Sequence, residues 1–532
     1  MSTIDFTLPY PSRAPVLARN VVAASQPLAA QAGLQAMARG GNAVDAALAA
    51  AIVLTVVEPT MNGIGGDAFA LIWDGAQLHG LNASGRAPAA WNPKAFAELQ
   101  KMPALGWGTV TVPGTVSAWV AMSERFGALP FADLFEAAIR YARDGYAVSP
   151  VIARQWQEAA PQLQDQPGYR EAFMPAGRTP RAGERWRFEA QAATLEDIAR
   201  TRGESFYRGR LARAIAEFAR ATGGAIDEAD LAAHRVDWVE PVSHTYHGFT
   251  VHEIPPNGQG IAALMALGML EHLPVADTQP DSAQRLHLQA EAMRLAFADA
   301  AAHVADPSHM RVSADALLDR DYLASRARLV DPGRAGRYGA GQPPGGATVY
   351  LCAADAQGRM VSFIQSNFKG FGSGVVVPGT GIALHNRGMG FSLEPGHPNL
   401  VAGGKRPYHT IIPAFMTRDG QPVMAFGVMG GNMQPQGHLQ VAMRFIDDRR
   451  NPQACSDAPR WRIDDAGQLT VEAATPAAAV QGLQAMGHSV RVMPHDSLDF
   501  GSAQLIARLS EGLDDGYATG SDHRRDGQAV GF

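Results

Sequence analysis

Cysteine is scarce in this chain, with Cys352 and Cys455 the two cysteines among 532 residues. Two cysteines cannot build a disulfide framework at this length, and neither stands in a CxxC or CxxH pattern that would predict a structural zinc site. Long apolar runs are also missing: the most apolar stretch, 46–57, is far shorter than the roughly 20 residues of a membrane-spanning helix. The N-terminus lacks a basic start followed by an apolar run, so we expect a cytoplasmic protein without a signal peptide or membrane contact.

An excess of positive charge is lacking as well. The 45 Lys and Arg residues stand against 51 Asp and Glu, which gives a net charge of −6 and a pI near 6.2. Such a chain has no general attraction for phosphate backbones, so nucleic acid is not an expected partner. The paired basic residues Arg449-Arg450 and Arg524-Arg525 are interpreted as solvated surface. A hydrophobic fraction of 46% is ample for a core and excludes disorder as the main state.

The order of helix and strand signals predicts an α+β protein. Gln26-Pro27 opens an alanine-rich helix, Gly40-Gly41 ends it, and Asn42 can cap a second helix. A strand is expected at 68–73, mostly helices from about 115 to 330, and a strand at 249–254 leading into a helix at 261–270. The C-terminal third favours hairpins, with strands at 348–354 and 360–366 and at 410–417 and 422–428. Antiparallel sheets covered by helices are the expected arrangement.

The clearest break in composition precedes Thr348. Residues 331–347 are rich in Gly and Pro and predict a mobile loop, after which Thr348 opens a strand. If the chain were cut between Ala347 and Thr348, the new α-amine, with a reference pKa of about 7.7–8.0, could take the proton of the threonine hydroxyl. By itself, however, a threonine at this position is more often a β-branched residue that begins an edge strand.

Other catalytic and cofactor signatures are weak or missing. There is no GxSxG, Walker A or HExxH sequence. Ser366 and Lys369 match SxxK, but the glycines that follow do not suit the helix that this motif requires. His287 and Glu291 lie four apart on an expected helix and could share a metal, yet without a third ligand they are interpreted as a solvated face. No metal and no organic cofactor is therefore expected.

Several motifs, in matching order, resemble the γ-glutamyltranspeptidase family. They are Gly40–Ala47, Asn62–Gly66, Val112–Val116, the run from Thr348 through Asp355–Gly358 and Ser366 to Gly374, Lys405-Arg406-Pro407, and Gly430-Gly431. The resemblance extends over residues 20–525. It implies an N-terminal nucleophile hydrolase with a four-layer αββα sandwich, made as a proenzyme that cleaves itself between Ala347 and Thr348. The large subunit would be 1–347 and the small subunit 348–532, forming an αβ heterodimer and possibly (αβ)₂.

The resemblance also implies roles for individual residues. Thr348 would attack the amide carbonyl of a small-molecule γ-glutamyl compound, and Ser366 would support it, with Gln365, Asn367 and Asn386 as further polar neighbours. The backbone N–H groups of Gly430 and Gly431 would stabilise the oxyanion, a role that suits glycine because a missing Cβ permits close approach. Water or an amine would then accept the acyl group.

The residues around the acyl group depart from the family pattern. Where the family has an arginine that binds the α-carboxylate, this chain has Ser84, and Arg86 stands two residues later. The acidic residue that binds the α-amine is replaced near Gly388–Gly390, Arg387 stands where glutamine is usual, and His409-Thr410 replaces a Ser-Ser pair. The loop between Phe391 and Lys405 is shortened to 13 residues. We interpret these six positions, Ser84, Arg86, Asn386, Arg387, His409 and Thr410, as candidate substrate-binding residues.

Two functions of the same class and one of another class follow. The leading hypothesis is a γ-glutamyltransferase or glutathione hydrolase. The alternative is an acylase that acts on glutaryl-like or other acyl amides, as the cephalosporin acylases of this superfamily do, because Arg387 would favour a carboxylate. The third is an unprocessed, non-catalytic binding protein, against which the retained Thr348 and Ser366 argue.

Overall fold

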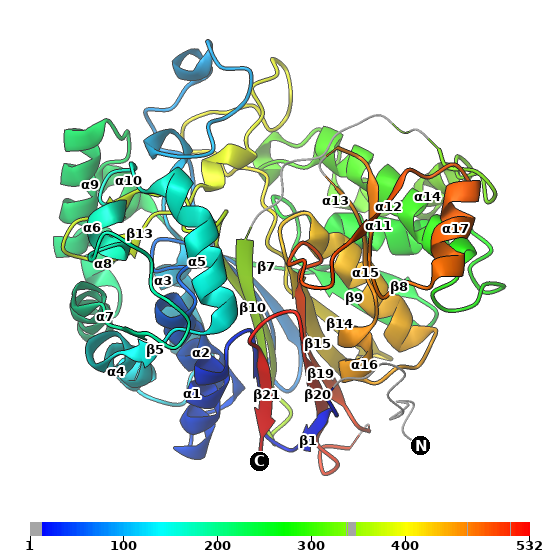
Figure 1. Ribbon diagram of the computed structural model, residues 1–532, viewed down its shortest axis with the longest axis horizontal. Helices are drawn as coiled ribbons and strands as arrows, with labels where there is room; N and C mark the ends of the chain where they lie inside the picture. The colour runs from blue at the N-terminus through cyan, green and yellow to red at the C-terminus, as the bar shows by residue number, and fades with distance from the viewer. Residues whose placement is uncertain (1–12, 337, 339–346, 465, 511) are drawn as a thin grey trace.

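Two seven-stranded antiparallel β-sheets lie face to face at the centre of the molecule (Figure 1). The computed structural model describes residues 13–336, 338, 347–464, 466–510 and 512–532. The first sheet has the order β1 (Val16–Ala18), β20 (Tyr517–Ser521), β19 (Ser502–Arg508), β15 (Gln421–Met429), β14 (Ala414–Arg418), β9 (Phe249–Glu253) and β8 (Val242–Tyr246). The second has the order β21 (Gln528–Gly531), β2 (Val21–Ala24), β10 (Ala347–Ala354), β11 (Met360–Phe368), β3 (Asp67–Trp73), β4 (Leu78–Asn82) and β7 (Asp237–Val239).

Helices cover the outer face of each sheet, so the expected αββα sandwich is confirmed. Against the second sheet pack α1 (Pro27–Ala38), α2 (Ala43–Val57) and α3 (Thr115–Phe126). The same side of the molecule holds α4 (Glu136–Asp144), α5 (Pro150–Leu163), α6 (Tyr169–Phe173), α7 (Glu189–Thr201), α8 (Glu204–Arg208), α9 (Arg210–Thr222) and α10 (Glu228–Ala233).

The other side of the sandwich is covered by α11 (Ile261–Leu270), α12 (Ala283–His303), α13 (Ala314–Leu317), α14 (Arg320–Ala327), α15 (Met433–Ile446), α16 (Pro452–Asp457) and α17 (Ala477–Ala485). Of these, α11, α15 and α16 contact the first sheet directly. Small sheets join β5 (Tyr146–Ala147) to β6 (Arg185–Trp186), β12 (Val376–Val377) to β13 (Ile382–Ala383), and β16 (Trp461–Ile463) to β17 (Leu469–Glu472) and β18 (Val490–Met493).

Local signals set the ends of the helices next to the second sheet. The Gln26 side chain accepts a hydrogen bond from the N–H of Leu28 and so caps α1. Asn42 and Asp45 form a capping box at the start of α2, as the sequence predicts for Asn42. Every residue of α2 is buried, because alanine and β-branched residues surround the helix on all sides and let it pack closely against β10 and β11.

The predicted hairpins are confirmed with adjusted ends. β10 pairs with β11, and β14 pairs with β15, each antiparallel. The strand expected at 410–417 begins only at Ala414, because the main chain before it contacts the loop at Asn257 and Gln259 instead of a neighbouring strand. The predicted mobile loop 331–347 falls partly outside the described residues, which lack 337 and 339–346.

Two interpretations of charged pairs were wrong. Arg524 and Arg525 are 7% exposed rather than solvated, and Arg524 pairs with Glu472 and Asp522. His287 and Glu291 are fully buried on α12 instead of forming a solvated face. Glu472 lies 52 residues from Arg524, and His488 lies 201 residues from His287, so no local pattern could have indicated these contacts.

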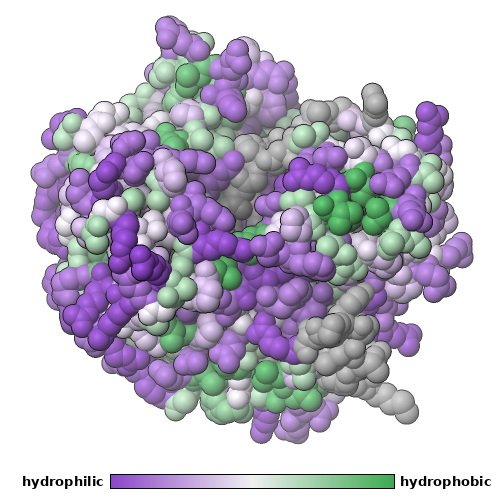
Figure 2. All heavy atoms as spheres, viewed as in Figure 1, coloured by the Kyte–Doolittle hydropathy of each residue, from purple (hydrophilic) through white to green (hydrophobic). Residues whose placement is uncertain are grey.

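The surface is mainly hydrophilic on the face seen in Figure 2, with hydrophobic residues in separate patches. Within the part of the chain that the structure describes, no helix has the length and apolar character needed to cross a bilayer.

Candidate active site

Thr348 lies at a β-bulge near the start of β10. Ala347 pairs with Phe368 and Val349 pairs with Gln365, so Ser366 and Asn367 of β11 together face the single residue Thr348. A bulge of this kind redirects side chains and is frequent beside active sites. Thr348 is fully buried between the two sheets.

Two side chains contact the Thr348 hydroxyl directly. Its Oγ1 donates to Oγ of Ser366 at 3.3 Å, and Nε2 of Gln434 donates to the same Oγ1 at 3.3 Å. Gln434 lies in the first turn of α15, and its Oε1 accepts from the N–H of Ile412, which fixes the amide. The sequence predicts Ser366 at this place but not Gln434, although its position three residues after Gly431 at a helix start could have indicated it.

Arg387, in the short 3₁₀ helix η5 (Arg387–Gly390), contacts the Ser366 hydroxyl of this pair. Nη2 donates to Oγ of Ser366 at 3.0 Å, and Nη1 donates to Oγ1 of Thr410 at 2.8 Å. The guanidinium carbon lies 4.3 Å from the centre of the Phe368 ring. Arg387, Thr410, Ser366 and Thr348 thus form one connected group, and all four are candidate site residues from the sequence.

The charge of Arg387 has no ion-pair partner among the described residues. The residue is fully buried, and its Nε has no hydrogen-bond acceptor there. Burial lowers the pKa of Arg387 to about 9, although the nearby Asp67 carboxylate favours the charged form. The group is still a cation at neutral pH. A buried cation that donates only to neutral hydroxyls is an incomplete site for an anion.

Asp67, at the start of β3, organises the polar residues behind Arg387. Its Oδ1 accepts from the N–H groups of Gly85 and Gly114, and its Oδ2 accepts from Nε2 of His409 at 3.1 Å. Burial alone would raise the pKa of Asp67, but His385, His409 and Arg387 hold it below its usual range. Sequence reasoning missed Asp67, although it directly follows the Asn62–Gly66 motif.

The imidazole of His409 hydrogen-bonds to the Asp67 carboxylate. Burial and the nearby Arg387 cation lower the pKa of His409 to about 3 despite the favourable hydrogen bond to Asp67, so the imidazole is neutral at pH 7. Its Nδ1 accepts from the N–H of Ile411. Within the described chain His409 makes no hydrogen bond to Thr348, Ser366 or Arg387. The observed contacts therefore give it a positioning role for the segment that carries Thr410.

Ser84 and Arg86 are engaged elsewhere. The Ser84 hydroxyl donates to Asn82 and accepts from Asn257. Arg86 is 47% exposed in its side chain and pairs with Asp306 at 3.0 Å. In the described part of the chain, neither side chain hydrogen-bonds to Thr348, Ser366 or Arg387, so the structure does not join these two candidates to the group around the nucleophile.

The amide side chains near β11 divide into two kinds. Asn386 accepts from the N–H of Lys369 and donates to the carbonyl of Ala104, and Gln365 donates to Ala51 and Asn62, so both hold loops together. Asn367 is different: it is fully buried, and neither its Oδ1 nor its Nδ2 has a partner among the described residues. A Cβ at Gly63 or Gly66 would come within 2.9 Å of this amide, which explains the glycines of that motif.

Gly430 and Gly431 form the turn between β15 and α15. Their φ angles are +127° and +60°, in the region that glycine adopts most readily. The Gly431 carbonyl accepts from Nε2 of Gln259, and Gln434 links the turn to Thr348. Neither N–H of the pair has an acceptor among the described residues. Free N–H groups at the start of a 14-residue helix are suited to stabilising negative charge.

A cavity of about 1630 Å³ lies beside this group. It is lined by Lys369 after β11, by Met389 and Gly390 of η5, and by the shortened loop from Phe391 to Asn399. Lys101 and Arg311 also line it. Thr348, Ser366, Arg387 and Thr410 are not among its lining residues, and the cavity reaches η5 through Met389 and Gly390.

Comparison with known proteins identifies the family of the chain. The Gamma-glutamyltranspeptidase family model matches residues 29–532. The oxamate amidohydrolase proenzyme of Klebsiella pneumoniae is 38% identical over 95% of this chain and 97% of its own length. The glutathione hydrolase-like YwrD proenzyme of Bacillus subtilis is 34% identical over 97% of this chain and 98% of its own. The crystal structure of cephalosporin acylase from Bacillus halodurans superposes with a TM-score of 0.94, at 47% identity and 99% coverage of both chains. The chain therefore belongs to the γ-glutamyltranspeptidase family, whose members are amide-hydrolysing or acyl-transferring enzymes with the N-terminal nucleophile hydrolase fold.

Proposed function

We propose that the chain is a proenzyme that cleaves itself between Ala347 and Thr348 and then hydrolyses a small amide with Thr348 as nucleophile. The observation that carries this proposal is the buried Thr348 hydroxyl, held by Ser366 and Gln434 at a bulge directly after the bond to be cut. The names of the relatives, which are proenzymes, support it.

Cleavage and catalysis would use the same atoms. Oγ1 of Thr348 attacks the carbonyl of Ala347, the C–N bond breaks as its nitrogen takes the hydroxyl proton, and water hydrolyses the resulting ester. The freed α-amine, with a pKa of about 7.7–8.0, then serves as general base for attack on the substrate amide. The acyl-enzyme ester is passed to water or to an amine. The N–H groups of Gly430 and Gly431 would stabilise the negative oxygen of each tetrahedral intermediate.

We infer that the acyl group carries a carboxylate close to the scissile carbonyl. Arg387 lacks an anionic partner, and one hydroxyl, that of Ser366, separates it from Oγ1 of Thr348 at 3.0 and 3.3 Å. The carboxylate of Asp67 already accepts hydrogen bonds from His409 and two backbone N–H groups, so Asp67 is not a free partner for an α-ammonium group. Oxamate, whose carboxylate adjoins its amide carbonyl and which names the Klebsiella relative, fits this arrangement.

A glutaryl-like acyl amide with a bulky leaving group is the second candidate. The cavity beside η5 favours it, because its volume of about 1630 Å³ exceeds what a small amide needs. The superposition on a cephalosporin acylase supports the same alternative. The γ-glutamyl donors of the leading sequence hypothesis remain a prediction.

Mass spectrometry under denaturing conditions tests the processing step. We expect fragments of about 37 and about 20 kDa, the shares of residues 1–347 and 348–532 in a chain of 56.4 kDa, with threonine first in the smaller one. Thr348→Ala should stay intact, because the attacking hydroxyl is gone. A single intact chain in both samples would instead favour the non-catalytic binding protein.

Kinetics on matched amides test the acyl group. We expect kcat/KM to be at least about tenfold higher for oxamate than for glutamine, the γ-glutamyl amide that also releases ammonia, since a hydrogen bond to a charged group contributes about 1.5–3 kcal/mol. Glutaramate, the glutaryl amide with the same leaving group, separates the second candidate from the first. A preference for the γ-glutamyl compound would overturn the assignment of Arg387 as the carboxylate anchor while leaving the processing proposal intact.

A further inference from the structure

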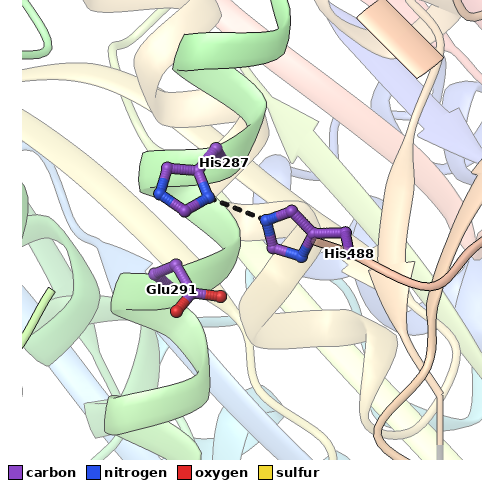
Figure 3. A group of neighbouring side chains, drawn as sticks. All are labelled: His287, Glu291 and His488. Carbon is purple, nitrogen blue, oxygen red and sulfur yellow. Dashed lines mark hydrogen bonds between the residues drawn. The ribbon is translucent and has the colours of Figure 1, made fainter. Parts of the chain in front are cut away.

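A second polar cluster lies outside the candidate active site, where α12 meets the loop after α17. His287 and Glu291 project from one turn of α12 toward His488 (Figure 3). One ligand atom from each residue lies within 4.8 Å of the others. The residues are 0%, 0% and 6% exposed. His488 is the third ligand that sequence spacing could not supply, because it lies about 200 residues away in the chain.

The hydrogen bonds determine which nitrogen atoms face the centre of the cluster. Nε2 of His287 donates to the carbonyl of Asp331 at 2.8 Å, so Nδ1 of the neutral ring carries the lone pair. That Nδ1 accepts from Nε2 of His488 at 2.7 Å. Metal-binding histidines are commonly oriented in this way, with the outer N–H on a backbone carbonyl and the inner nitrogen free to bind.

Glu291 supplies a carboxylate to the same centre. Its Oε2 accepts from the N–H of Gly336 at 2.7 Å. Its Oε1 accepts no hydrogen bond from the described residues and lies 3.4 Å from Nε of Arg294. Each carboxylate oxygen has two lone pairs, so these contacts leave positions for a metal.

We propose that His287, Glu291 and His488 bind a zinc ion. Two imidazoles and one carboxylate suit zinc better than magnesium or calcium, which prefer oxygen ligands throughout. The ion replaces the proton between Nδ1 of His287 and Nε2 of His488, and that proton moves to Nδ1 of His488, so both rings stay neutral. Tetrahedral zinc at about 2.0–2.1 Å requires ligand atoms roughly 3.4 Å apart, so the two nitrogens separate by about 0.7 Å and water takes the fourth position.

The site joins the two parts of the chain that processing would separate. His287 and Glu291 precede the Ala347–Thr348 bond, and His488 follows it. This consequence rests on the proposed cleavage, whereas metal binding itself does not. The ion would hold α12 against the C-terminal part of the molecule after the covalent link is lost.

Zinc analysis after equilibrium dialysis tests the proposal on the full protein. Wild type, stripped with EDTA and dialysed against zinc, should retain one equivalent per chain. His488→Gln should weaken binding at least tenfold, because its amide nitrogen can donate to His287 but cannot bind zinc, and its amide oxygen is a weaker zinc ligand than imidazole. The matched control is His495→Gln, which removes an exposed histidine from the same C-terminal segment and should bind zinc as wild type does.

A measurement on wild type alone covers the case in which His488→Gln does not fold. Cobalt substituted for zinc should give the strong visible bands of a tetrahedral site, and X-ray absorption should identify two imidazoles. Less than one equivalent of zinc, absence of those bands, equal binding by wild type and His488→Gln, or loss of zinc in His495→Gln would each overturn the proposal. Intact-mass measurement of the same samples records cleavage separately, so failure of the metal site is distinguishable from failure of processing.

Discussion

Arg387 combines three properties that rarely occur together in a side chain: full burial, a charge at neutral pH and neutral hydrogen-bond partners only, within the described residues. Taking a charge out of water is costly unless an opposite charge or several hydrogen bonds compensate for it. Here Ser366, Thr410 and the Phe368 ring compensate in part. An anionic substrate group would compensate for the rest of the cost of burying this charge.

Replacing Arg387 tests this role at the residue scale. Arg387→Gln should raise KM for oxamate at least about tenfold, because a charge-assisted hydrogen bond is lost. Oxamide, the neutral isostere, is the matched control and should change much less. A similar loss on both amides would indicate that Arg387 only positions Ser366.

The pH dependence of KM should follow the protonation of Arg387. Because burial lowers its pKa to about 9, the cation is present below that pH and is lost as the pH rises through it. KM for oxamate should therefore rise above about pH 9, whereas KM for oxamide should stay level. Initial rates at fixed ionic strength, with kcat and KM separated, provide the readout.

Among the loops, close packing determines the positions of the polar groups around Asp67. The N–H groups of Gly85 and Gly114 reach Asp67 because both residues lie against neighbouring main chain. A Cβ at Gly114 would come 1.5 Å from the carbonyl oxygen of Ala83, and one at Gly85 would come equally close to that of Val112. The loops that hold Asp67, and through it His409, therefore tolerate no side chain at these two positions.

Gly114→Ala should destabilise the protein strongly for this reason. We expect a loss of several kcal/mol, since backbone must move and a buried carboxylate loses a donor. Gly333→Ala is the matched control, because the nearest atom to its Cβ is 3.7 Å away. Thermal unfolding of both variants, followed by circular dichroism, measures the difference. Equal melting temperatures would contradict the tight approach of these loops.

The parts of the chain before and after the Ala347–Thr348 bond both contribute strands to each of the two large sheets. β10 and β11 lie between β2 and β3 in one sheet, and β20, β19, β15 and β14 lie between β1 and β9 in the other. Each sheet therefore contains strands from before and after the bond, and both parts of the chain contribute to both hydrophobic cores. Separating the two fragments would break sheet hydrogen bonds and expose buried strands to water. Cleavage of one peptide bond does not offset that free-energy cost.

Cleaved fragments should accordingly stay together. Size-exclusion chromatography in native buffer should give one species that contains both fragments, and denaturant should be needed to part them. The uncleaved Thr348→Ala protein is the control for overall shape. Separate elution of the fragments without denaturant would contradict sheets that are shared between them. A doubled apparent mass would indicate the (αβ)₂ state.

Features that depend on near neighbours in the chain could be predicted from the sequence. Helix caps at Gln26 and Asn42, the hairpin beginning at Thr348 and the glycine turn at Gly430 arise from contacts over a few residues, and the ordered motifs pointed to the family and its sandwich fold. These signals are local, because propensity, capping and turn geometry act within one or two turns of chain.

Which polar residues meet depends on how distant segments of the chain pack. Packing brings Gln434 to Thr348 and Arg387 to Ser366, directs Ser84 to Asn257 and Arg86 to Asp306, and turns His409 toward Asp67. It also supplies His488 to His287 and Glu291. Such contacts depend on how sheets and helices from distant parts of the chain pack, and the energy of a buried charge depends on that packing rather than on sequence spacing.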